Sequence, residues 1–116
     1  MKYILIFYIS ISNLFSYDCG ELLFDGNCVT CHFKTKSISA PSMNEVQQRY
    51  KKAFPNKKEF VEYMATWVQH PNKNSSLMQD AITKYEIMPE LGFDKNTLEK
   101  ISCYIYETDF TLHKVN

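Results

Sequence analysis

Apolar residues recur at helical spacing along most of the chain, and no run alternates strictly between apolar and polar positions as a half-buried strand does. Helices are therefore predicted over residues 18–27, 44–52, 56–70, 77–85 and 94–108. Leu98, Ile101 and Ile105 form the apolar stripe of the last of these helices. The pattern predicts an all-α fold of several short helices.

Two of the predicted helices carry clear boundary residues. Asn56 lies three residues before Glu59, which is a capping signal at a helix N-terminus. Pro71 ends the same helix, because the residue before a proline avoids helical geometry. Asp94 is suited to cap the final helix.

The segments between the helices are long for a chain of 116 residues. Residues 33–42 are rich in Ser and Lys, and Met88, Pro89 and Gly92 lie in a second extended segment. A large prosthetic group would explain such loops, because it supplies core that the chain does not. A glycine-rich phosphate loop is excluded, since the chain has only 3 glycines.

Residues 1–16 have the composition of a secretory signal peptide. Lys2 supplies the positive charge, residues 3–15 are mostly apolar, and Ser16 is a small residue at which cleavage could occur. An uncleaved anchor is the alternative, although a spanning helix needs roughly 20 apolar residues. The sequence thus predicts a leader over 1–16, a domain over 17–116, and an exported, periplasmic protein that is soluble or membrane-associated.

The charges balance, with 13 basic and 13 acidic residues. No global field therefore marks nucleic acid as a partner. The sequence leaves the oligomeric state open.

The segment from Cys28 to His32 reads Cys-Val-Thr-Cys-His. Two thiols at this spacing can add to the two vinyl groups of one haem, and the adjacent His can bind its iron, so the motif in an exported chain predicts c-type haem attachment. A zinc site is the alternative, but it would need a fourth ligand outside any second paired motif. A thioredoxin-like pair would follow a strand, which the pattern lacks, and a disulfide between Cys28 and Cys31 would leave His32 unexplained.

Around this motif the chain resembles the class I cytochromes c, from about Gly20 to Tyr106. Gly20 and Phe24 precede Cys28 as in that family's N-terminal helix, while Ile101 and Tyr104 resemble its C-terminal helix. The resemblance implies a cytochrome c-like fold of short helices and long loops around one covalent haem c. It also implies that these two helices cross, with Gly20 giving close approach to Tyr104.

The resemblance further implies the two axial ligands of the iron. Pro41 resembles the loop proline whose carbonyl binds the proximal His, here His32. Met88, followed by Pro89, resembles the loop that presents the distal ligand. Met78 is the alternative, and His70 or an open position follows, since the stretch before Met88 is longer than in compact members of the family.

Cys19 and Cys103 lie outside the haem motif. Each falls on one of the two helices that the resemblance places in contact, so the crossing could bring them within disulfide range. The sequence leaves open whether they are bridged or free.

These features predict a one-electron carrier between redox proteins outside the cytoplasm, and not an enzyme. The alternatives are a haem protein that binds a gas or peroxide, and a fixed electron relay within a membrane respiratory complex. Trp67 could bind a haem propionate, with a core position as the simpler interpretation. Six lysines could surround the haem edge and steer an acidic partner, or could simply be solvated: Lys34, Lys36, Lys51, Lys52, Lys57 and Lys58.

Overall fold

A computed structural model describes residues 19–29 and 31–111, and in these residues it contains only helices. The predicted leader over residues 1–16 and its alternative as an anchor lie outside the described residues. The elements are α1 (Glu21–Asn27), α2 (Met43–Ala53), α3 (Lys57–Gln69), the short 3₁₀ helix η1 (Lys73–Ser75), α4 (Gln79–Tyr85) and α5 (Lys95–Glu107). The all-α prediction is confirmed for this part of the chain. Within it, no helix is long and apolar enough to cross a bilayer.

Side-chain caps set the starts of the longer helices. The Asn56 side chain accepts hydrogen bonds from the backbone N–H groups of Lys58 and Glu59, as predicted for α3. Asp94 likewise accepts from Thr97 N–H at the start of α5. These bonds satisfy donors that a helix leaves unpaired in its first turn.

Two predicted helices begin more than one residue later than expected. The first starts at Glu21 rather than residue 18, because the backbone N–H of Gly20 donates instead to Lys100 O, at 2.9 Å. The fourth starts at Gln79 rather than residue 77, and the N–H of Met78 is bonded by the Ser76 hydroxyl. Local contacts outside the helix thus shorten both elements.

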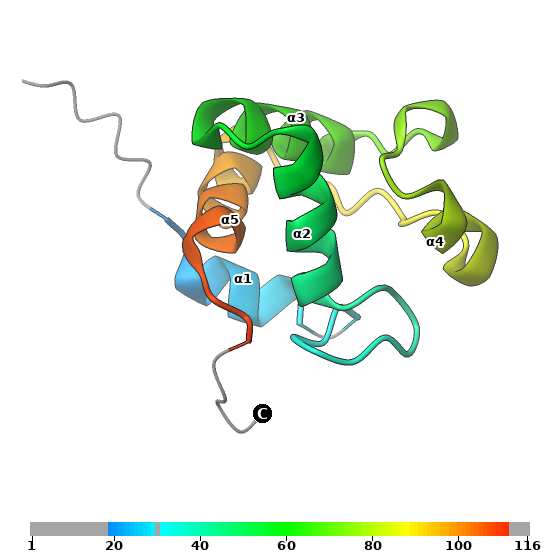
Figure 1. Ribbon diagram of the computed structural model, residues 1–116. Coiled ribbons are helices and arrows are strands. Elements are labelled where there is room, and N and C mark those ends of the chain that lie inside the picture. The colour runs from blue at the N-terminus through cyan, green and yellow to red at the C-terminus, as the bar shows by residue number, and fades with distance from the viewer. Residues whose placement is uncertain (1–18, 30, 112–116) are drawn as a thin grey trace, which may run out of the picture.

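Most of the core lies among α1, α2, α3 and α5, which together are here called the body (Figure 1). The most extensive helix contact is that of α3 with α5. Phe60 and Val61 of α3 are fully buried, as is Phe24 of α1. The buried Gln47 side chain of α2 donates to the carbonyls of Ile105 and Thr108, so it ties α2 to the end of α5.

The crossing of α1 and α5 differs in one respect from the expectation. On α5 the residue nearest to Gly20 is Lys100, since a Cβ at Gly20 would stand 3.4 Å from the Lys100 Cβ. The Tyr104 ring instead contacts Phe24, with ring centroids 5.1 Å apart. The glycine therefore allows the backbones to meet one turn earlier on α5 than predicted, and Phe24 takes the aromatic contact.

A disulfide joins Cys19 to Cys103 at this crossing, with their Cα atoms 5.1 Å apart. Cys103 is completely buried, and Cys19 is half-buried. The bond fixes the start of α1 to α5 across 84 residues of sequence.

Residues 71–93, here called the pocket lobe, lie to one side of the body and contain η1 and α4 (Figure 1). None of the residues of α4 is buried. After α4 the chain continues without helix or strand up to Asp94, as predicted for Met88 and Gly92. Two residues in this stretch have left-handed φ angles, Glu86 at 71° and Gly92 at 79°.

Candidate functional site

A cavity of about 240 Å³ lies between the body and the pocket lobe. Its walls come from the segment after α1, from α2, α3 and α5, and from the lobe. Most of the lining side chains are apolar or aromatic, among them Val46, Trp67, Ile87 and Phe93. Such a space suits a flat apolar ligand held by a few polar or coordinating groups.

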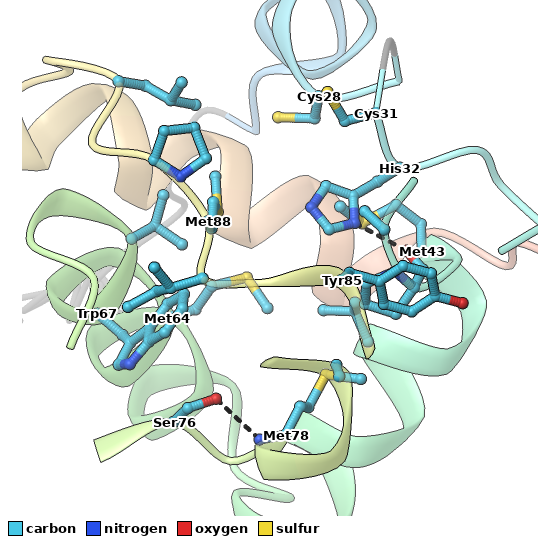
Figure 2. A pocket seen from close by; sticks show the side chains of 18 of the residues that line it. Cys28, Cys31, His32, Met43, Met64, Trp67, Ser76, Met78, Tyr85 and Met88 are labelled. Atoms are coloured by element: carbon cyan, nitrogen blue, oxygen red, sulfur yellow. Dashed lines mark hydrogen bonds between the residues drawn. The ribbon is translucent and has the colours of Figure 1, made fainter. Parts of the chain in front are cut away.

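Cys28, Cys31 and His32 lie together on one wall of this cavity. The backbone N–H of His32 donates to the Cys28 carbonyl at 2.9 Å, so the segment forms one turn directly after α1. Figure 2 shows both thiols beside each other above the imidazole ring. Both thiols are free, whereas Cys19 and Cys103 pair with each other.

A backbone hydrogen bond orients the His32 ring. Its Nδ1 lies 2.8 Å from the carbonyl oxygen of Pro41. A carbonyl oxygen can only accept, so Nδ1 carries the proton and the lone pair of Nε2 is available for a metal. Burial lowers the pKa of His32 below its ordinary value, while the bond to Pro41 opposes that shift. Burial, the larger of the two effects, favours the neutral imidazole that a metal requires, and the bond to Pro41 fixes which ring nitrogen carries the proton.

The two thiols differ in their surroundings. Cys31 is exposed, whereas Cys28 is half-buried and burial raises the pKa of its thiol to about 11. Cys28 is therefore a neutral thiol at pH 7, which disfavours a role as a nucleophile or as part of a redox pair of the thioredoxin type.

Four methionines line the cavity: Met43, Met64, Met78 and Met88. Figure 2 shows Met88 across the cavity from His32, and Met78 at the end farthest from Cys28 and Cys31. Met88 is half-buried, whereas the other three are buried. The position opposite the imidazole makes Met88 the better candidate for a second axial ligand.

Sequence reasoning did not assign Met43 and Met64 to the site. Met64 is both buried and at the cavity wall. The signal was present, because Met64 and Trp67 share one face of α3 at a spacing of three residues. In a domain with an internal cavity, the apolar face of a helix can both pack in the core and line the cavity.

Trp67 and His70 have other partners than those considered from the sequence. Trp67 lines the cavity, but its indole N–H donates to the Asn72 carbonyl at 3.0 Å. That donor is therefore already engaged and does not point to a propionate. The His70 side chain is 74% exposed and lies 2.6 Å from Glu90, so it is not at the cavity.

The six lysines were considered either as a ring around the haem edge or as solvated side chains, and none of them lines the cavity. No lysine lines the cavity within the described residues. Lys51 and Lys57 instead lie at the turn between α2 and α3, where Lys51 stacks on the Tyr106 ring and Lys57 pairs with Glu107.

The residues at this cavity fit a covalently attached haem. Two free thiols, an imidazole with its Nε2 available and a thioether on the facing wall converge on one apolar space. A zinc ion would be less well served, because thioethers are soft ligands that zinc sites in proteins rarely use.

Comparison with other proteins adds little to this geometry. An uncharacterised protein of Aquifex aeolicus (strain VF5) is 29% identical to the chain over 72 residues, which cover 60% of this chain and 47% of that protein. The chain thus matches about half the length of this relative. No protein-family model matches the chain, and no solved structure matches it. The functional argument therefore rests on the site itself.

Proposed function

We propose that the protein is a monohaem c-type cytochrome with a cytochrome c-like fold, which carries single electrons between redox proteins outside the cytoplasm. The observation that carries the proposal is the convergence of Cys28, Cys31, His32 and Met88 on one apolar cavity. Cys28 and Cys31 would hold haem c through thioether bonds, and His32 and Met88 would be its axial ligands.

Bound haem would supply an iron centre that changes between the ferric and ferrous states. The chain's own contribution is to fix the environment of that centre. Pro41 orients the His32 ring, and the apolar walls limit the access of water. A thioether opposite the imidazole favours a higher reduction potential and occupies the position that a small molecule would need. Both effects suit electron transfer better than catalysis.

The first test is the optical spectrum of the protein produced in a host that matures c-type cytochromes. We expect haem that stays attached after denaturation, together with the weak red absorption band of methionine bound to ferric iron. Met88→Ala should abolish that band. Met78→Ala is the matched control, because Met78 lines the same cavity, and it should keep the band.

Other results would point to other functions. Covalent haem without the red band in the wild type, combined with rapid carbon monoxide binding, would favour a protein that binds gas or peroxide. Stable co-purification with a membrane enzyme would favour a fixed electron relay. Zinc in place of haem would contradict the proposal.

A further inference from the structure

The pocket lobe contributes Met88 to the site, yet its helix is weakly anchored. None of the residues of α4 is buried, and α4 packs on the other helices far less than α3 packs on α5. The buried residue nearest to α4 is Met78, directly before it, which is 6% exposed, and the half-buried Leu77 and Ala81 also pack against the core. Met88 follows the end of α4 by three residues. The position of α4 therefore affects the segment that carries Met88.

One ion pair joins α4 to the body. Arg49 of α2 binds Asp80 of α4 through both guanidinium nitrogens, with Nη1–Oδ1 at 2.9 Å and Nη2–Oδ2 at 2.5 Å. Glu45, one turn earlier on α2, lies 3.4 Å from the same guanidinium. A two-point bond of this kind fixes direction as well as distance, which a single contact through lysine does not.

We propose that Arg49 is a positioning residue, which acts through Asp80 to keep the pocket lobe closed and so to keep Met88 on the iron. The proposal rests on the function proposed above. Opening of the lobe would require the Arg49–Asp80 bonds to break, and Met88 would leave with the lobe. The pair thereby limits how often another ligand can reach the sixth position.

The test is the rate at which imidazole replaces the methionine in the ferric holoprotein, followed by loss of the red band. At high imidazole concentration the rate should reach a plateau, because departure of Met88 becomes limiting. Arg49→Gln and Asp80→Asn should each raise that plateau about twofold to fivefold, the range for partly exposed ion pairs. The double variant should show no further increase, since both single changes break the same bond.

A matched control separates positioning from general stability. Lys95 and Glu62 form an ion pair at 2.6 Å with side chains 41% and 58% exposed, close to the 38% and 61% of Arg49 and Asp80. This pair joins α5 to α3, so Glu62→Gln should leave the plateau unchanged. Arg49→Lys should give a plateau rate between those of the wild type and Arg49→Gln, because lysine keeps the charge but not the two-point bond. Added salt should raise the plateau exchange rate of the wild type more than that of Arg49→Gln, because screening weakens the charged pair.

The outcomes distinguish this proposal from the function on which it rests. If the holoprotein shows the red band but Arg49→Gln and Asp80→Asn exchange at the wild-type rate, the positioning role is wrong and the cytochrome proposal stands. A rate that rises linearly with imidazole up to the highest concentration, without a plateau, would also contradict it, because departure of Met88 with the lobe would then not limit the exchange. If no haem is attached, both proposals fail together.

Discussion

The body and the pocket lobe are held together in different ways. In the body, α3 packs on α5 around buried aromatic side chains, and a disulfide fixes α1 to α5. In the lobe, α4 has no buried residue, and polar contacts link the lobe to the body, among them Trp67 to Asn72 and His70 to Glu90. A region with few buried apolar contacts opens at lower free energy than a core. The body should therefore unfold last and the lobe should open first.

This difference divides the candidate site. Cys28 and His32 follow α1 directly, and the loop after them is tied to α2 by a bond from Met43 N–H to the Phe33 carbonyl. Met88, in contrast, belongs to the lobe. The residues that would bind haem covalently thus lie on the body, and the proposed exchangeable ligand lies on the less firmly packed lobe. Covalent attachment to the body would retain haem even when the lobe opens.

The largest expected effect comes from the core of the body. Phe60 is fully buried between α2 and α5, and its ring meets those of Tyr50 and Tyr106. Phe60→Ala should lower the free energy of unfolding by about 4 kcal/mol, through lost burial and the cavity left behind. Urea denaturation followed by circular dichroism measures this change.

Leu91 is the matched site in the lobe, where the side chain is 44% exposed. Leu91→Ala should cost less than about 1 kcal/mol, since surface substitutions usually have small effects. Equal losses of unfolding free energy for Phe60→Ala and Leu91→Ala would show that body and lobe unfold as one unit, and would contradict the difference in stability between them.

The disulfide should have the next largest effect, and it should act on the body alone. Replacing both Cys19 and Cys103 by Ser should cost about 3 kcal/mol, because the bond restricts a long loop in the unfolded chain. Urea denaturation checks the loss of stability. The rate of imidazole exchange at the iron should stay unchanged, because the disulfide lies away from the lobe. A faster exchange would mean that the two regions are coupled through α5.

The sequence predicted the regular parts of the body well. Asn56 and Asp94 were assigned as helix caps, and both side chains accept the expected backbone hydrogen bonds. Cap residues and apolar periodicity act over three or four neighbouring positions, so they can be recognised without tertiary structure. The positions of Cys28, Cys31 and His32 at one cavity wall follow from their closeness in sequence.

The parts that depend on contacts between distant segments were predicted less well. The partner of Gly20 was expected to be Tyr104 and is Lys100, a shift of one helical turn. Two roles were left open for the lysines, and the sequence did not show that Lys57 lies at the start of α3, where it pairs with Glu107. The Arg49–Asp80 pair joins residues 31 positions apart and has no local signal in the sequence. Such contacts are set by how helices pack, which periodicity alone does not determine.

The smallest expected effects lie in the backbone of the lobe. Gly92 has a φ angle of 79°, and no described atom lies within 4 Å of a Cβ built on it. Gly92→Ala should therefore cost about 1 kcal/mol through its backbone conformation alone. Glu86 has a φ angle of 71°, and Glu86→Gly should stabilise the protein by up to about 1 kcal/mol.

Gly26 provides the control for both changes. It lies within α1, also has open space around a built Cβ, and has no left-handed φ. Gly26→Ala should be neutral or stabilising by up to about 1 kcal/mol, because alanine is the better helix former. Urea denaturation of the three variants measures the differences. If Gly92→Ala and Gly26→Ala shift stability in the same direction, the left-handed turn is not maintained in solution. Met88 would then lie on a segment with more than one backbone conformation, and the conformational freedom of the lobe would include the proposed ligand itself.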